Sequence, residues 1–338
     1  MGVKPLSVTI KDVARAAKVS VATVSRALNG HNNVAESVRR RVLSVASEMR
    51  YSPHHAARSL SSRRTHTIGV VLPDLHGEFF SELVRGIDQV ARECSQHLLV
   101  SSYHGHPEEQ ASALRAMRGR VDGLLVMSPH VGDTESLGEN LAAMPAVLIN
   151  SRPTEVGQVA LGIDNYGGAR AMVEHLLGAG HRRIAFITGP ENNFDAHERQ
   201  RGYLDAMASG APEQQTWIVQ GDFSEAAGHR AGLLLAEGAL PDAVFAANDM
   251  MALGCLFAFN QAQVSVPGQV AIAGFDDIPI ARYVVPALTT MRVNIAELGA
   301  NAMRLLLDLQ HEDMQVERRP PLLSPQLIVR ESSRPRHA

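Results

Sequence analysis

The chain has 338 residues, of which 45% are hydrophobic, so it is long enough to bury a sizeable core and to form two or three domains. Its two cysteines, Cys94 and Cys255, fit no CxxC or ligand-like spacing, which argues against a disulfide framework and a zinc site. The N-terminus carries charges every few residues, and no stretch reaches the roughly 18 apolar residues of a membrane helix. These features favour a cytoplasmic location over export or membrane insertion.

The net charge of -3 is unevenly distributed. Residues 1–66 contain twelve lysines and arginines against three acidic residues, a net charge of +9, whereas the remaining residues contain 20 basic and 32 acidic side chains, a net charge of -12. A small cationic segment on an anionic body is expected where only the small part must approach a polyanion, because neutralised phosphates release condensed counterions. A solvated basic surface would give the same pattern, so charge favours nucleic acid without deciding it.

Three short helices are predicted in this basic segment. Thr9, with Asp12 three residues later, forms a capping-box pattern that opens the first helix. Ser20 caps a second helix that runs to about Asn29, and a third covers residues 36–49. The connection between the first two helices has the length found in a helix-turn-helix. The predicted core positions are Val13, Ala16, Ala17, Val24, Leu28, Val38, Val42, Val45 and Met49.

The second helix, within VSVATVSRALNG, has a face that this core does not use. Val21, Ala22, Ser25 and Arg26 point outward, and the second helix of a helix-turn-helix enters the DNA major groove. Arg26 is able to donate two hydrogen bonds to guanine, and the methyl groups of Val21 and Ala22 suit a thymine methyl. The competing interpretation is that Arg26 is an ordinary solvated arginine. Together with the charge distribution, the helix pattern favours DNA recognition.

From Thr67 onward, short apolar runs alternate with helical segments. A first group consists of THTIGVVL, HLLVSSY, DGLLVM and PAVLIN, and a second of RIAFITG, TWIVQG, DAVFAAN and VAIAGFD. Each group is typical of a parallel sheet covered by helices. The predicted fold class is therefore α/β, with an N-terminal helix-turn-helix domain followed by a body of two parallel sheets. Ligands of such sheets bind beyond the carboxyl ends of the strands.

Six segments in chain order carry a resemblance to a known family. They are VTIKDVARAAKVSVATVSRALNG, RYSPHHAARSLSSRRTHTIGVVLPD, GIDNYGGARAMVEHLLGAGHRRIAFITGP, AHERQRGYLDAM, FAANDMMALG and VAIAGFDDIPIARYVVPALTTMRVN. They resemble the LacI/GalR family of bacterial transcription regulators over nearly the whole chain. The resemblance implies a hinge helix and a periplasmic-binding-protein-like body of two subdomains. The implied limits are 1–52 for the DNA-binding domain, 53–66 for the hinge helix and linker, 67–332 for the effector-binding and dimerisation domain (67–164 with 293–322, and 165–292 with 323–332), and 333–338 for a tail.

The resemblance also assigns DNA contacts. Residues 53–60 are too few for a stable isolated helix, so the hinge is expected to fold only on the operator. Leu60 would be wedged between base steps in the minor groove and kink the duplex, although a linker residue packed on the body is the alternative. The complete set of expected DNA-contacting residues is Thr9, Val21, Ala22, Ser25, Arg26, Asn29, Asn33, Tyr51, His54, Ala57, Arg58 and Leu60.

Strand ends in the body supply the candidate effector site. Arg199 in AHERQRG matches the arginine that the family directs at its effector, and Asn248 and Asp276 match hydrogen-bonding positions. Phe223 matches an aromatic position that stacks on a sugar or base. Helix capping is the alternative for Asn248 and Asp276, and core packing is the alternative for Phe223. The complete set of candidates is Phe80, Asn150, Asp164, Arg199, Phe223, Asn248 and Asp276.

A carboxylate, an amide and a guanidinium in one cleft suit vicinal hydroxyls, so a sugar is the expected effector, with a nucleoside or purine as the alternative. No GxGxxG, P-loop, GxSxG or HExxH is present, so no enzymatic activity, cofactor or metal is expected. A secreted solute-binding protein would not explain the basic helix-turn-helix. The sequence thus predicts a dimeric repressor of a carbohydrate-utilisation operon that binds a palindromic operator. Whether the effector acts as inducer or corepressor stays open.

Overall fold

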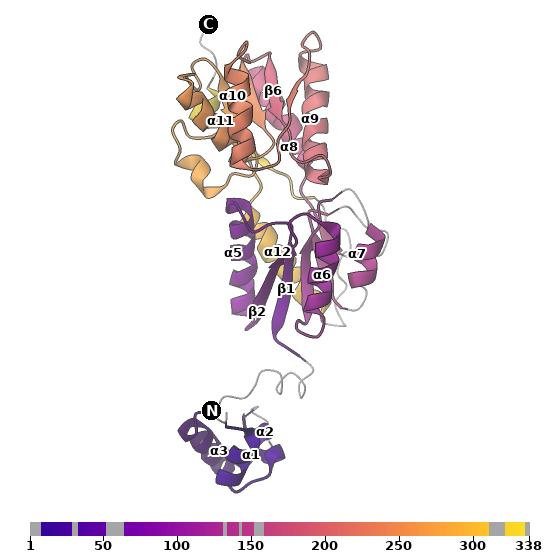
Figure 1. Cartoon of the computed structure of the whole chain (residues 1–338), viewed down its shortest axis with the longest axis vertical. Helices are drawn as coiled ribbons and strands as arrows, with labels where there is room; N and C mark the ends of the chain where they lie inside the picture. The colour runs from indigo at the N-terminus through magenta and orange to yellow at the C-terminus, as the bar shows by residue number, and fades with distance from the viewer. Residues whose placement is uncertain are drawn as a thin grey trace, which may run out of the picture. The chain divides into compact units, whose positions relative to one another are not determined.

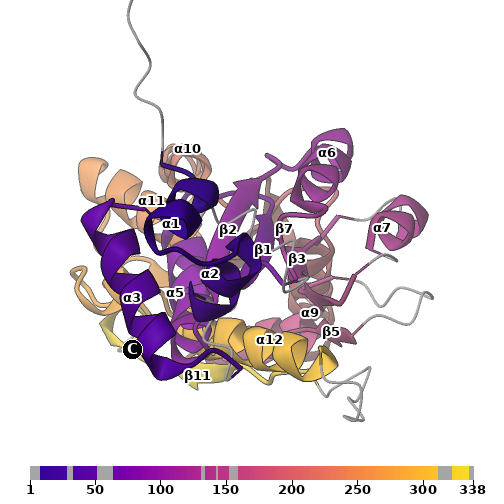
Figure 2. The ribbon, with the colours of Figure 1, turned by 90° about the horizontal axis from the view of Figure 1, so that it is seen from below.

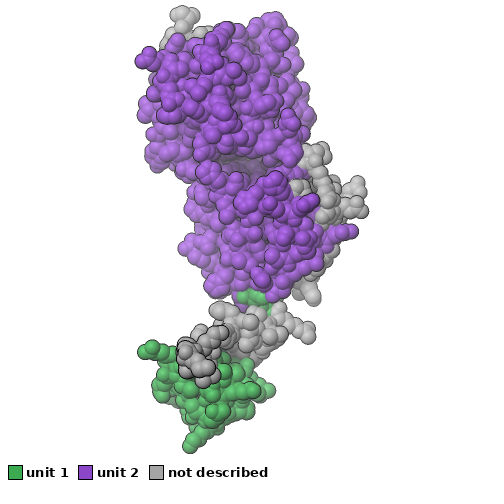
Figure 3. All heavy atoms as spheres, viewed as in Figure 1, with its two compact units in different colours: residues 1–65 green, residues 66–338 purple. Residues whose placement is uncertain are grey.

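The computed structural model describes residues 8–28, 33–51, 64–130, 134–141, 144–151, 159–310 and 322–334. The chain divides into two compact units, residues 1–65 and residues 66–338, which are green and purple in Figure 3. Each unit has its own hydrophobic core, so each is able to hold its structure by itself.

The first unit contains three short helices, α1 (Ile10–Ala16), α2 (Val21–Leu28) and α3 (Glu36–Glu48), which Figure 2 shows most clearly. The predicted starts of the first two are confirmed. The Asp12 carboxylate accepts the backbone N–H of Thr9 at 3.0 Å, and Ser20 Oγ accepts the N–H of Thr23 at 3.1 Å. These side chains satisfy N–H groups that no helical carbonyl reaches.

The core of this unit differs from the prediction at one position. Val13, Val24 and Val42 are fully buried, as predicted. Ala16, however, is exposed, whereas Ala14 and Ala17 are buried. Ala14 therefore takes the place in the core that the sequence pattern gave to Ala16.

The first sheet of the second unit has the strand order β2-β1-β3-β4-β5, and all neighbours are parallel. Its strands are β1 (Thr67–Leu72), β2 (His97–Ser102), β3 (Gly123–Met127), β4 (Ala146–Ile149) and β5 (Val159–Leu161). Its helices are α5 (Glu78–Glu93), α6 (Pro107–Met117), α7 (Thr134–Leu141) and, from near the end of the chain, α12 (Ile295–Leu309), as Figure 1 shows.

Helices α5 and α12 pack closely because glycines lie at their contact. A Cβ on Gly86 would lie 1.8 Å from the Ala296 carbonyl oxygen, and one on Gly299 would lie 2.3 Å from the Leu83 carbonyl oxygen. No side chain fits at either position without separating the helices. This contact fastens the late helix α12 to the first sheet.

The second sheet has the order β7-β6-β8-β9 and is also parallel. Its strands are β6 (Ile184–Ile187), β7 (Trp217–Val219), β8 (Ala243–Ala246) and β9 (Ala271–Ala273). The surrounding helices are α8 (Asn165–Gly178), α9 (Phe194–Gly210), α10 (Glu225–Ala236) and α11 (Asp249–Gln261). Each of the eight apolar runs identified in the sequence contains one strand, so the prediction of two parallel sheets is confirmed.

Short segments connect the layers. Strand β10 (Thr290–Arg292) pairs antiparallel with β11 (Gln326–Ile328), and the 3-10 helices η1 (Pro279–Arg282) and η2 (Glu331–Ser333) lie near them in sequence. The buried Asp277 carboxylate accepts hydrogen bonds from Arg292 at 2.7 Å and Arg330 at 2.6 Å. One acidic side chain therefore ties two of the connecting segments together.

Candidate functional site

The outward face of α2 carries the predicted recognition residues. Val21, Ala22 and Arg26 are exposed and Ser25 is half-buried, whereas Val24 and Ala27 are buried in the core. The helix therefore uses one face for packing and leaves the other accessible.

The remaining predicted DNA contacts lie in several settings. Thr9 is held at the start of α1 by Asp12, and Asn33 is exposed before α3. Tyr51 is half-buried and packs on the core of the first unit, so its ring stabilises this domain whatever else it contacts. The other five predicted residues, Asn29, His54, Ala57, Arg58 and Leu60, lie outside the described residues.

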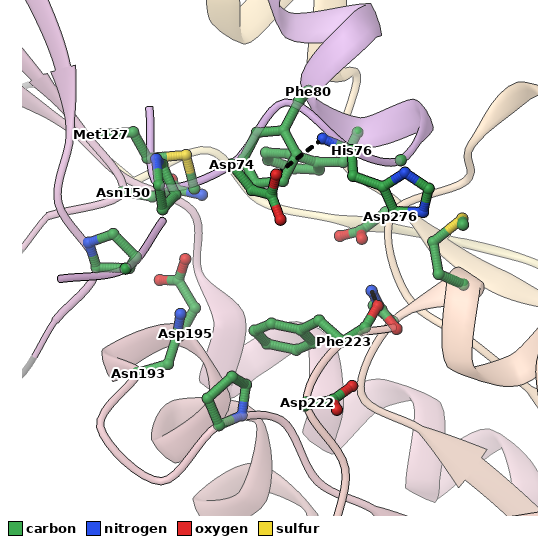
Figure 4. A pocket seen from close by; sticks show the side chains of 18 of the residues that line it. Asp74, His76, Phe80, Met127, Asn150, Asn193, Asp195, Asp222, Phe223 and Asp276 are labelled. Carbon is green, nitrogen blue, oxygen red and sulfur yellow. Dashed lines mark hydrogen bonds between the residues drawn. The ribbon is translucent and has the colours of Figure 1, made fainter. Parts of the chain in front are cut away.

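The second unit contains a cavity of about 290 Å³, shown in Figure 4. Its walls come from the carboxyl ends of strands in both sheets and from the first turns of the helices that follow them. Six of the seven candidate effector residues line it, namely Phe80, Asn150, Arg199, Phe223, Asn248 and Asp276.

Asp164 is the candidate that the structure does not place in this lining. Its carboxylate accepts the backbone N–H of Gly167 at 2.8 Å and caps α8. Asp164 therefore has a capping role, in which aspartate satisfies an N–H group of the first helical turn, and an effector contact at Asp164 stays a prediction.

Arg199 is the centre of the buried polar network. Its Nε donates to the Asn165 side-chain oxygen at 2.8 Å, one terminal nitrogen donates to the Ala247 carbonyl, and the other donates to the Asp276 carboxylate at 3.3 Å. The guanidinium also lies over the Phe275 ring, 3.9 Å from its centroid. This arrangement holds Asp276 at the cavity wall while compensating its charge.

Asp195, one helical turn before Arg199, was not among the candidates. The Asn165 amide donates to its carboxylate at 2.8 Å, so Asn165 bridges Asp195 and Arg199. Burial raises the pKa of Asp195 to about 7, against the opposing effect of the Arg199 charge. Burial likewise raises the pKa of Asp276 to about 6. The i, i+4 spacing of acid and arginine in FDAHER was the available signal, but such pairs are common on exposed helices.

Asn248 and Phe223, which both follow strands of the second sheet, are joined by a hydrogen bond. Asn248 Oδ1 accepts the N–H of Met251 and caps α11, while its amide donates to the Phe223 carbonyl at 2.9 Å. Phe223 has a positive φ of 70° and lines the cavity. In Figure 4 the Phe223 and Phe80 rings lie on opposite sides of the open space. Asn248 therefore fulfils the capping alternative and also positions an aromatic wall of the cavity.

Replacing Asp195 should change stability in a pH-dependent way. The raised pKa means that the folded protein binds a proton more tightly than the unfolded chain between about pH 4 and pH 7, so ionisation of Asp195 destabilises the fold as pH rises through this window. Asp195→Asn removes this penalty and should raise the free energy of unfolding by up to about 4 kcal/mol near pH 8, with the gain shrinking toward about pH 4. Thermal melts across this range measure it. Asp205→Asn, an exposed position on the same helix, is the control, and an equal gain at all pH values would contradict the prediction.

Comparison with known proteins identifies the two units. Residues 9–54 match the model for bacterial regulatory proteins of the lacI family, and residues 173–333 match that for a periplasmic binding protein-like domain. Catabolite control protein A of Priestia megaterium is 35% identical over 314 residues, covering 91% of this chain and 94% of that protein. The chain belongs to the lacI family of bacterial regulatory proteins. It is a DNA-binding transcription regulator, and its relatives are regulators rather than enzymes.

Solved structures of lacI family regulators are similar to this chain over most of its length. The Lac repressor dimer bound to operator and the anti-inducer ONPF superimposes with a TM-score of 0.85 at 27% identity, covering 98% of this chain and 100% of that chain. A LacI family regulator from Enterococcus faecium with bound ribose has a TM-score of 0.71 at 29% identity, covering 80% and 99%. Within the described part of the chain, no helix is long and apolar enough to cross a membrane.

Proposed function

We propose that this regulator is a repressor of a carbohydrate-utilisation operon that binds a palindromic operator as a dimer in the cytoplasm. Residues of the α2 face, above all Arg26, would read the major groove, and a small sugar in the cavity would change operator affinity. Support comes from a solved relative that is a dimer bound to operator and from another with bound ribose. The hinge residues that would complete the DNA interface lie outside the described residues.

The observation that carries the sugar assignment is the mixed polar and aromatic lining of the cavity. Asp276 offers acceptors, Arg199 holds it in place, and Phe223 offers a flat apolar surface. A sugar combines these needs, since its hydroxyls donate to carboxylates and its C–H face packs on an aromatic ring. The two rings on opposite sides of the cavity also suit a planar base, which makes a nucleoside the second candidate.

The cavity wall combines residues from both sheets of the second unit, which suggests how a bound ligand would change operator affinity. Phe80 and Asn150 belong to the first sheet and its helices, whereas Phe223 and Asn248 belong to the second. A ligand touching both would favour one relative angle of the two layers over another, because it binds the two conformations with different affinity. That angle would set the geometry of the paired DNA-binding domains.

A thermal-shift screen of the full chain against neutral sugars and nucleosides tests this proposal. Ligand at about 100 times its Kd should stabilise the folded state by about 2.7 kcal/mol. A shift with sugars, lost in Asp276→Asn, supports the sugar assignment. A shift confined to nucleosides would favour the second candidate, and a shift that Asp276→Asn leaves unchanged would place the ligand elsewhere.

A further inference from the structure

The helices that begin at the cavity carry acidic residues in their first turns. Four helices begin at its wall, α5, α9, α10 and α11, and a helix N-terminus ordinarily favours a bound anion. Each of the four carries an acidic residue in its own first turn, namely Glu78, Asp195, Glu225 and Asp249. Burial raises the pKa of Asp195 and of Asp249, so Glu78 and Glu225 are the residues that supply negative charge against the attraction that these termini would exert on a phosphate.

The N–H groups at these helix starts are also engaged. Asn193 caps α9 by accepting from Ala196 at 3.0 Å, and Ser224 caps α10 by accepting from Ala227 at 3.1 Å. Asn248 caps α11 in the same way. In each of these three helices a side-chain cap already occupies one N–H group of the first turn that a phosphate would otherwise use.

Among the residues of the cavity lining that the structure describes, Arg199 is the one source of a guanidinium or ammonium group. The Arg199 side chain is 4% exposed. Its three donor nitrogens are directed at Asn165, Ala247 and Asp276. Each terminal nitrogen of Arg199 carries a second N–H, but an anion that used it would compete with Asp276 for the one buried cation among the described lining residues.

Acidic groups outnumber this single cation. The lining contains five carboxyl groups, those of Asp74, Asp195, Asp222, Glu225 and Asp276. Of these, Glu225 is paired with His76 at 3.2 Å and Asp222 with Arg230 at 3.4 Å, both in partly exposed positions where pairing is weak. The field inside the cavity therefore opposes entry of negative charge.

Two residues of the cavity lining, Asn150 and His130, carry buried side-chain atoms without a hydrogen-bond partner. Asn150 is 3% exposed and its side-chain oxygen accepts no hydrogen bond. Neither ring nitrogen of His130 has a hydrogen-bond partner, and burial lowers the pKa of His130, which favours the neutral imidazole. Figure 4 shows Asn150 on the same side of the open space as Asp195. Buried polar atoms without a hydrogen-bond partner are rare, and hydroxyl groups of a bound ligand would supply partners for those of Asn150 and His130.

We infer that the cavity selects an uncharged, hydroxyl-bearing ligand whose polar end contacts Asp195 and Asn150, and that it rejects phosphorylated sugars and nucleotides. This inference rests on the proposed function, in that the cavity is taken as the effector site. It narrows the effector to free sugars or nucleosides.

Matched pairs of ligands test the inference by calorimetry on the full chain. The pairs are D-ribose, D-galactose and D-glucose, each with its monophosphate ester, and adenosine with adenosine monophosphate. At pH 8, where Asp195 is ionised, the unphosphorylated member of a binding pair should bind roughly 100-fold more tightly, because a phosphate monoester adds nearly two negative charges beside the carboxylates of the lining. Asp195→Asn should weaken the parent compound and reduce the discrimination to roughly tenfold, whereas Asp205→Asn on the same helix should change neither.

The outcomes separate the inference from the proposed function. An ester that binds as tightly as its parent, with binding lost in Asp276→Asn, would overturn the charge selectivity while leaving the cavity as the effector site. Binding of neither member of any pair would contradict the proposed function and the inference with it. Discrimination that Asp195→Asn leaves at its wild-type value would overturn the role given to Asp195.

Discussion

Arg199→Ala should lower the free energy of unfolding by about 3–5 kcal/mol and abolish effector binding, because it leaves buried acidic groups without their cation. Arg199 is 3% exposed and holds Asn165, Ala247 and Asp276 together at the cavity wall. Without it, Asp276 and Asp195 would have to take up protons or admit water. Denaturant unfolding measures the loss of stability, and calorimetry with a ligand from the thermal-shift screen measures the loss of binding.

Two further variants separate the role of Arg199 from a general effect of losing a charged side chain. Arg201→Ala is the matched control, since Arg201 lies two residues away on α9 but is 55% exposed, pairs with Glu198 and lies over the Tyr166 ring, so its loss should cost about 1 kcal/mol or less. Asp276→Asn retains an oxygen for Arg199 and should fold, yet bind ligand at least tenfold more weakly. Equal stability of the Arg199→Ala and Arg201→Ala proteins would contradict the compensating role of Arg199.

Arg26→Ala should weaken operator binding by about 1–3 kcal/mol and remove discrimination at one base pair in each half-site. Arg26 is exposed on the face of α2 opposite the buried Val24 and Ala27, so the change leaves the small core intact. Binding titrations against an operator obtained by selection from random DNA, and against single-base variants of it, measure the effect.

Arg41→Ala provides the control, because Arg41 is an exposed arginine on α3, outside the helix-turn-helix pair. It should weaken operator and random DNA alike through the lost charge, if it acts at all. The same uniform weakening in Arg26→Ala would make Arg26 a phosphate contact rather than a base contact.

The elements of the fold that were predictable had strong local signals. The caps of α1 and α2 were visible as Thr9 with Asp12 and as Ser20, and each apolar run of the body became a strand. Strands β5, β10 and β11 were not predicted, and the antiparallel pairing of β10 with β11 joins segments far apart in the chain. Long-range pairing of this kind leaves no local trace.

The candidate site also contains residues that the sequence predicted and residues that it did not. Residues at strand ends, such as Asn248 and Asp276, were placed at the cavity because parallel strands present their carboxyl ends at one edge. Asp164 also follows a strand, but its carboxylate turns back to cap α8, a choice that sequence cannot distinguish from a ligand contact. Asp195 was missed for the opposite reason, since its role depends on burial by elements from three parts of the chain.

Operator affinity measured with and without a ligand from the thermal-shift screen tests the central claim, that this regulator's DNA binding is controlled from the cavity. Fluorescence anisotropy on the selected operator should show the ligand changing wild-type affinity by at least about fivefold, in either direction, as coupling between two sites requires. The Asp276→Asn protein should bind operator with wild-type affinity in the absence of ligand and show no change when ligand is added. An equal ligand effect in both proteins, or none in the wild type, would contradict control of the operator from this cavity.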